Sequence, residues 1–218
     1  MERLACARAS VWRGKVATAP RAVIPTGYRE LDRALPGGGW PLGAITEILV
    51  DGYGIGELGL LMPALAALTK EDPARPKKWV AWIAPPFIPY APALQQHGVD
   101  IDRLLMIHPT SSVKSRWWAI EQAVRSGASA GALAWVATAD GVVLRRLQLA
   151  AEEQGCWLLL FRPPSARLQR SPAALRVHLS QAQGVTRVEI VKCRGGQPGV
   201  VHVPGFALDG AASQASSR

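Results

Sequence analysis

The stretch that decides the fold is IPTGYRELDRALPGGGWPLGAITEILVDGYGIGELGLLMPALAAL, residues 24–68. Residues 44–50, AITEILV, are an apolar run that predicts a buried strand. Four glycines follow at positions 52, 54, 56 and 59, and leucines at 58, 60, 61, 65 and 68 predict an apolar helix. Nucleotide-binding folds hold phosphate where a strand enters a glycine-rich turn and a helix, because the turn directs backbone N–H groups at the anion.

The turn lacks the side chains of a working phosphate-binding P-loop. That motif has the form G-x-x-x-x-G-K-[ST], in which the lysine neutralises phosphate and the hydroxyl reaches Mg²⁺. The chain reads Asp51-Gly52-Tyr53-Gly54-Ile55-Gly56-Glu57-Leu58, so Glu57 replaces the lysine and Leu58 the hydroxyl residue. A carboxylate at this position repels a triphosphate. We therefore interpret the turn as a degenerate P-loop, formed by Gly52, Gly54, Gly56, Glu57 and Leu58, and predict no nucleotide cofactor.

Two later strands also lack the acidic residues that an ATPase of this kind requires. Residues 79–84, WVAWIA, run into Pro85-Pro86-Phe87, and no carboxylate follows to activate water. Residues 131–136, GALAWV, should end in an aspartate that holds Mg²⁺, but Trp135 stands there. Three losses together predict a protein that is not an enzyme. Asp100 and Asp102 have no third ligand nearby in the sequence, so we predict no metal site.

Further motifs accompany this stretch, and their combination resembles a known family. They include Ile24-Pro25-Thr26-Gly27, Gly37-Gly38-Gly39-Trp40-Pro41-Leu42-Gly43, Ala84-Pro85-Pro86, Glu121-Gln122-Ala123 and Leu144-Arg145-Arg146-Leu147. The first two are similar to the segment that leads into the P-loop of the RecA recombinases. Across about residues 11–195 the chain resembles the ImuA family of RecA-like, SulA-related accessory proteins of bacterial SOS-induced mutagenesis.

The resemblance implies a role through contact with other proteins. It implies error-prone translesion DNA synthesis in a complex with ImuB, an inactive Y-family polymerase homologue, and an error-prone polymerase. DNA and RecA are further candidate partners, and self-association stays open. In RecA-like proteins an N-terminal helix packs on a neighbouring subunit, so Val11, Trp12 and Arg13 are a candidate docking element. An arm folded onto its own domain is an equally good interpretation.

Alternating strand and helix patterns predict an α/β fold, with a mostly parallel sheet flanked by helices on both faces. Residues 175–179 and 185–191 alternate apolar and polar residues, which predicts a C-terminal antiparallel hairpin with one solvent-exposed face. Residues 162–167 are expected to form an exposed loop, where the resemblance places a DNA-contacting segment. The predicted domains are an N-terminal arm or short helix at 1–20, a RecA-like domain at 21–208 and a disordered tail at 209–218.

The chain is strongly basic, with a formal net charge of +9 and a pI near 10.1. Such proteins commonly bind nucleic acid or an acidic partner. Arg187, Lys192 and Arg194 are candidate contacts with nucleic-acid phosphates. A solubilising surface, or an edge strand protected by basic residues, explains the same residues about as well.

The three cysteines, Cys6, Cys156 and Cys193, lack C-x-x-C spacing and cannot all pair, which predicts a reduced, cytoplasmic protein. We expect neither a secretory signal nor a membrane span, because no apolar run is long enough. The leading functional prediction is a non-catalytic accessory protein of SOS mutagenesis. The alternatives are an atypical ATPase completed by a partner, a SulA-like inhibitor of cell division, and an independent DNA-binding protein.

Overall fold

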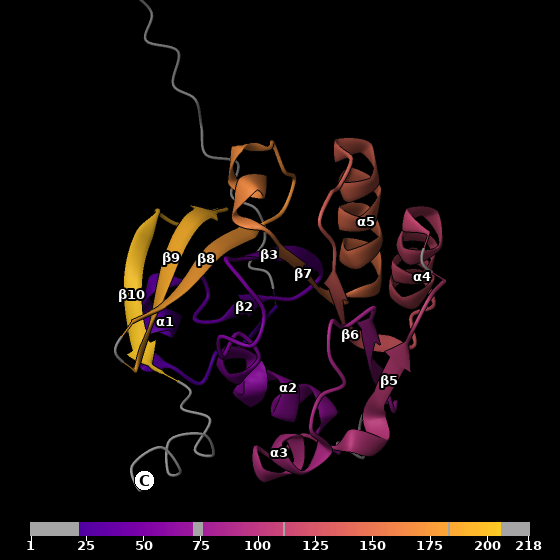
Figure 1. Cartoon of the computed structure of the whole chain (residues 1–218), viewed down its shortest axis with the longest axis horizontal. Coiled ribbons are helices and arrows are strands. Elements are labelled where there is room, and N and C mark those ends of the chain that lie inside the picture. Colours follow the sequence, from indigo (N-terminus) through magenta and orange to yellow (C-terminus); the bar gives the residue numbers. More distant parts are fainter. Residues whose placement is uncertain (1–21, 72–75, 111, 183, 206–218) are drawn as a thin grey trace, which may run out of the picture.

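The computed structural model of the chain describes residues 22–71, 76–110, 112–182 and 184–205. Within them, an eight-stranded sheet has the order β10-β9-β8-β3-β7-β6-β4-β5 (Figure 1). The strands from β8 to β5 run parallel, and β9 and β10 extend the sheet in antiparallel pairing. The α/β class, the mostly parallel sheet and the C-terminal antiparallel hairpin are therefore confirmed.

Most strands coincide with apolar runs of the sequence, because parallel strands covered on both faces need apolar residues throughout. Every residue of β3 and β7 is buried. A separate pair, β1 (Val23–Ile24) and β2 (Trp40–Pro41), precedes the main sheet. The strands of the main sheet are β3 (Ala44–Val50), β4 (Trp79–Ile83), β5 (Leu104–Ile107), β6 (Ser129–Trp135), β7 (Trp157–Arg162), β8 (Leu175–Ala182), β9 (Val185–Cys193) and β10 (Gly199–Pro204).

Helices cover both faces of the sheet (Figure 1). One buried cluster joins the sheet to residues of α1, α2 and α3, and a second cluster joins its other face to α4 and α5. None of the helices in the described part of the chain has the length and apolarity to cross a membrane. The helices are α1 (Arg29–Ala34), α2 (Met62–Thr69), α3 (Ala91–Gln96), α4 (Val113–Arg125) and α5 (Gly141–Gln154), with 3-10 turns η1 (Gly59–Leu61), η2 (Ile101–Arg103) and η3 (Pro164–Leu168).

Local sequence sets both ends of α5, the longest of these helices. The Asp140 carboxylate accepts a hydrogen bond from the Val142 N–H at 3.0 Å, which satisfies one free donor of the first turn. Gly155 ends the helix with a φ of 65°, a left-handed conformation that glycine adopts without strain. In the middle of the helix, Gln148 accepts a hydrogen bond from the Ile45 N–H at 3.0 Å and so fastens α5 to β3.

Three expectations about the last third of the chain need correction. The predicted exposed loop at 162–167 is wrong, because Arg162 and Ala166 are both fully buried. The alternation in residues 175–179 predicts that polar residues such as Arg176 face solvent, but Arg176 is only 5% exposed. Finally, β9 is not an edge strand, because β10 pairs with it along its length. Both arginines form buried ion pairs with a carboxylate, which explains why they are not exposed.

Some predictions concern residues outside the described ranges. They are the N-terminal arm at 1–20, with its docking residues Val11, Trp12 and Arg13, and the tail at 209–218.

Candidate functional site

The glycine-rich turn after β3 is an irregular loop rather than a direct entry into an α-helix. Gly54 and Gly56 have φ values of 82° and 88°, in the left-handed region that only glycine adopts freely. The chain then forms η1, and α2 begins at Met62, later than the sequence pattern predicted. The loop therefore keeps the backbone turns that direct N–H groups inward, although a full helix does not start at its end.

The carboxylate of Glu57 fills the concave side of this loop. Its Oε1 accepts a hydrogen bond from the Gly54 N–H at 3.0 Å, and its Oε2 accepts one from the Ile55 N–H at 2.9 Å. The residue is only 5% exposed. Consecutive backbone N–H groups that converge on one acceptor form an anion-binding nest. In this protein the anion in the nest is a side chain of the loop itself.

This arrangement works against phosphate in two ways. A phosphate group would need the same two N–H donors that Glu57 already occupies. It would also lie close to the carboxylate charge, and two unit charges 4 Å apart repel by about 4 kcal/mol at an effective dielectric constant near 20. Glu57 therefore occupies two N–H donors of the loop, and residues 51–58 include no Lys or Arg that would neutralise a triphosphate.

Aromatic side chains occupy the strand ends where an ATPase would carry its acidic residues. Trp135, the last residue of β6, stacks on Phe161 of β7 with ring centroids 4.7 Å apart and planes inclined by 12°. Trp82 of β4 packs against Trp135 at 5.8 Å. Trp82 is completely buried and Trp135 is 5% exposed. These three side chains thus form an aromatic layer and offer no oxygen ligand for a cation at their own positions.

The acidic pair before β5 has a local structural role. Asp100 accepts a hydrogen bond from the Asp102 N–H at 3.0 Å and forms an ion pair of 3.4 Å with Arg103. These contacts cap η2, so the first carboxylate is already engaged. Among the described residues, no group of three or more His, Cys, Asp and Glu side chains is placed to hold a metal ion.

The buried thiols behave as apolar core groups. Cys156 is fully buried, and burial raises the pKa of its thiol to about 12. Burial also raises the pKa of the half-buried Cys193 thiol. Both groups are therefore neutral and weakly nucleophilic at neutral pH. Cys6 lies outside the described residues.

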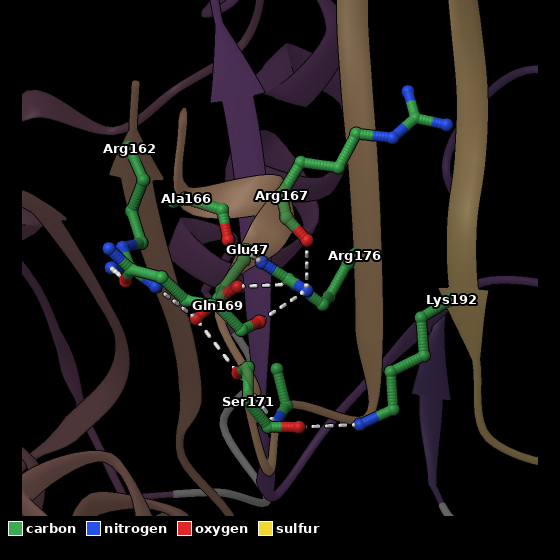
Figure 2. A network of polar contacts seen from close by, with 9 residues as sticks. Glu47, Arg162, Ala166, Arg167, Gln169, Ser171, Arg176 and Lys192 are labelled. Carbon is green, nitrogen blue, oxygen red and sulfur yellow. Dashed lines mark hydrogen bonds and ion pairs between the residues drawn. The ribbon is translucent and has the colours of Figure 1, made fainter. Parts of the chain in front are cut away.

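A second polar centre lies on the other face of β3, around the buried Glu47 (Figure 2). Arg162 of β7 donates to Glu47 Oε1 at 2.9 Å, and Arg176 of β8 donates to Glu47 Oε2 at 2.6 Å. The Ser171 hydroxyl donates to Oε1 at 2.9 Å. A buried carboxylate is costly unless it is paired and hydrogen-bonded, and these three donors meet both conditions.

The same arginines hold the segment 163–174 against the sheet (Figure 2). Arg176 donates to the carbonyl oxygens of Ala166 at 2.6 Å and Gln169 at 3.1 Å. Arg162 donates to the Gln169 side chain at 2.6 Å, and Lys192 donates to the Ser171 carbonyl at 2.7 Å. The segment that was expected to be a free loop is therefore fixed at several points of its backbone.

Sequence analysis did not identify Glu47 as important, although a signal was present. It is the one charged residue in the run AITEILV, and a lone charge in a fully buried strand requires a partner. Arg162 directly after the apolar run of β7 gave a second hint. The sequence could not show that the two residues meet, because they are 115 positions apart.

The three candidate nucleic-acid contacts lie on β9 and the turn that follows it, and each has an internal partner. Arg187 forms an ion pair with Glu189 at 3.1 Å, which Arg167 also contacts. Lys192 is bonded to Ser171 as described, and Arg194 donates to the Pro172 carbonyl at 3.5 Å. Burial, followed by repulsion from Arg194 and Arg176, lowers the pKa of the Lys192 amine.

Glu189 is the acidic centre of this basic surface. Hydrogen bonds from Arg167 and then Arg187 lower the pKa of its carboxyl group to about 2. His178 also faces it, with Nδ1 3.8 Å from Oε2. The local positive charge is therefore partly neutralised within the chain.

The chain is similar to two known proteins. It is 28% identical over 205 residues to Protein ImuA of Caulobacter vibrioides strain NA1000, covering 83% of this chain and 82% of the relative. Protein ImuA of the Caulobacter vibrioides strain ATCC 19089 matches with the same values. No family model matches the chain. These similarities support an ImuA-like relationship at a moderate level.

The buried network predicts a large loss of stability for Glu47→Gln. The change leaves two buried guanidinium groups facing a neutral amide, and breaking a buried ion pair costs about 3–5 kcal/mol. Urea unfolding of the purified variant measures this loss. The matched control is Glu153→Gln on the exposed side of α5, which we expect to stay within about 0.5 kcal/mol of the parent.

A second measurement applies if Glu47→Gln is too unstable for unfolding curves. Arg167 and Arg170 are exposed in the folded protein, and release of the segment 163–174 frees the backbone beside them for trypsin, so limited digestion should cut there first. Equal unfolding free energies for Glu47→Gln and the parent, with equal tryptic patterns, would contradict a structural role of the network.

The lowered pKa of the Glu189 carboxyl group predicts that this residue contributes to the free energy of unfolding in a pH-dependent way. Its folded pKa, about 2, is below its usual value of 4.5, so the contribution is present above about pH 4.5 and is lost as pH falls towards 2. Glu189→Gln should lower the unfolding free energy by about 0.5–1 kcal/mol at neutral pH, as for surface ion pairs, and have little effect near pH 2. Urea unfolding at both pH values tests this, and a pH-independent difference would contradict it.

Proposed function

We propose that this protein is a RecA-like, non-catalytic accessory protein of SOS-induced mutagenesis. It acts in error-prone translesion DNA synthesis by binding an ImuB-type polymerase homologue and an error-prone polymerase. It neither binds nor hydrolyses ATP, and its α/β fold serves as a scaffold for protein contacts.

The observation that carries the proposal is the position of the Glu57 carboxylate. It accepts hydrogen bonds from Gly54 and Ile55, in the concavity where a P-loop holds phosphate. The aromatic layer of Trp82, Trp135 and Phe161 supports the same conclusion, because it occupies the strand ends where Mg²⁺ ligands and a general base would be needed. A chain that lacks Mg²⁺ ligands and a general base at these positions is suited to act by binding other proteins.

The similarity to Protein ImuA supports the cellular context of this proposal. It extends over 83% of the chain, so it includes most of the described fold rather than one motif. The N-terminal residues Val11, Trp12 and Arg13 are proposed as the docking element for a partner. A separate DNA-binding function is less well supported, because Arg187 and Lys192 already bond to Glu189 and Ser171.

Capture of the polymerase homologue by the full-length chain tests the proposal. We expect a stable complex without added nucleotide, and a loss of about tenfold or more in affinity for Trp12→Ala, because large aromatic residues dominate such interfaces. Binding is measured by pull-down and by titration. The matched control is Trp118→Ala on α4, a tryptophan that is 64% exposed and should have little effect.

Two truncated chains locate the contact further. One begins at residue 21 and should lose binding, and the other ends at Gly205 and should keep it. The C-terminal cut is placed there because an earlier cut would remove β10 and expose β9. Failure of the full-length chain to bind the polymerase homologue, or a strict need for ATP in complex formation, would contradict the proposal.

A further inference from the structure

The segment between β4 and α3 presents large apolar side chains to solvent. It leads into α3 at the lower end of the view in Figure 1. Phe87, Ile88 and Tyr90 are 68%, 87% and 73% exposed. Phe87 and Tyr90 line the same cavity and Ile88 lies between them in the chain, so the three residues form one apolar patch. Such patches mark contact with another molecule, whereas single exposed apolar residues are common.

The backbone of this segment is held in a rigid and strained shape. Ala84 has a φ of 52°, in the left-handed region that residues with a side chain rarely adopt, and its N–H donates to the Ile107 carbonyl at 2.9 Å. Prolines at positions 85, 86 and 89 fix further φ angles. Backbone strain of this kind persists only where the surrounding structure enforces it, and it gathers at functional sites. The apolar patch is therefore preorganised, which reduces the conformational entropy lost on binding.

A cavity of about 310 Å³ lies directly beside the apolar patch. Four of its lining residues are exposed, so the cavity opens to solvent at Pro86, Phe87, Tyr90 and His97. Its inner walls come from the degenerate P-loop, α2 and the strands β4 and β6. A cavity of about 150 Å³ admits benzene, so the mouth of this one has room for an apolar side chain. The same surface thus carries a protruding apolar part and a concave part that can receive it.

The surface around the patch carries little charge. Residues 79–99 include no Asp, Glu, Lys or Arg, although these types make up 19% of the chain. Apart from Tyr90, the ionisable side chains among the described lining residues are those of Glu57 and His97. Glu57 is 5% exposed and bonded to the loop, which leaves His97 at the rim. Two copies of a chain with a net charge of +9 repel each other, so they approach most easily where their surfaces are uncharged.

We propose that the chain forms a homodimer through this surface, with a second copy as the occupant of the cavity mouth. Ile88 of each copy packs at the mouth of the cavity of the other copy, about a twofold axis. In such a contact the same patch serves on both sides, so every interaction occurs twice. One short segment and α3 form a small interface, which belongs to the weak, transient class. The dimer is independent of the proposed role in mutagenesis, because it uses neither nucleotide nor the proposed docking residue Trp12.

An apolar side chain of a different protein is the competing occupant. Charged groups across an interface provide much of its specificity for one partner, and residues 79–99 contribute no Asp, Glu, Lys or Arg. An acidic partner would be attracted to the basic surfaces of this chain rather than to an uncharged one. A second copy is the partner for which the absence of charge is an advantage, since it carries the same net charge of +9. The charge pattern therefore favours self-association at this patch.

Analytical ultracentrifugation of the full-length protein, freed of nucleic acid and studied at micromolar concentrations, tests the proposal. We expect a reversible dimer of twice the 23.3 kDa of one chain. Ile88→Asp should weaken dimerisation by about tenfold or more, because the interface would then bury two unpaired carboxylates. Ile88→Leu should keep the dimer. Since Ile88 is 87% exposed, both variants should fold like the parent, which circular dichroism and thermal unfolding check.

Leu168→Asp is the matched control, because Leu168 is 92% exposed but does not line the cavity. This variant and Trp12→Ala should dimerise like the parent. Added salt should strengthen the dimer by screening the repulsion between two basic chains, whereas association bridged by residual nucleic acid weakens with salt. A parent that stays monomeric, equal dimerisation of Ile88→Asp and the parent, a dimer lost in Trp12→Ala, or a dimer that dissociates when salt is added would overturn the proposal.

Discussion

The degenerate P-loop after β3 depends on one interaction. The backbone N–H groups of Gly54 and Ile55 donate hydrogen bonds to the Glu57 carboxylate. A loop with several N–H groups turned inward needs an acceptor, because unpaired buried donors are costly. Nucleotide-binding proteins obtain that acceptor from phosphate. This chain supplies it from its own sequence, so the loop is complete without a ligand.

A similar principle operates on the opposite face of β3, where Glu47 joins three adjacent strands. It lies between Arg162 of β7 and Arg176 of β8, and the two arginines extend the network to the segment 163–174. Buried ion pairs of this kind contribute more to a unique arrangement than to net stability. Here they fix the segment 163–174 together with the buried side chains of Ala166, Ala173 and Ala174. Two carboxylates are thus satisfied by donors of the chain itself, Glu47 within β3 and Glu57 in the loop that follows it.

Much of the fold was predictable from the sequence, because continuous runs of apolar residues bounded by glycines indicate the buried strands of a parallel sheet. The runs at 79–84 and 131–136 became β4 and β6 with shifts of one or two residues at their ends. β10 was missed, because Gly199–Pro204 contains both glycine and proline and its alternation is short. The burial of Arg162 and Arg176 was missed, because a charged side chain is expected to be exposed. It becomes buried only when it pairs with an opposite charge, here Glu47, which is distant in the sequence.

The candidate site was predictable in part. Positions 57 and 58 visibly lack the lysine and the hydroxyl residue of a P-loop, and the carboxylate at 57 predicted repulsion of phosphate. The sequence did not indicate that the Glu57 carboxylate would accept hydrogen bonds from the loop, since this depends on the backbone conformation at Gly54 and Gly56. The contact between the rings of Trp82 and Trp135 was likewise hidden, because the two residues are separated by more than fifty positions in sequence.

Titration calorimetry with ATP and Mg²⁺ on the full-length protein tests the central claim most directly. The account predicts no saturable binding at millimolar nucleotide, because Glu57 occupies the donors and repels the phosphates. The contradicting result is saturable binding that disappears in Gly54→Ala, a change that strains the loop backbone at a φ of 82° while its Cβ meets open space.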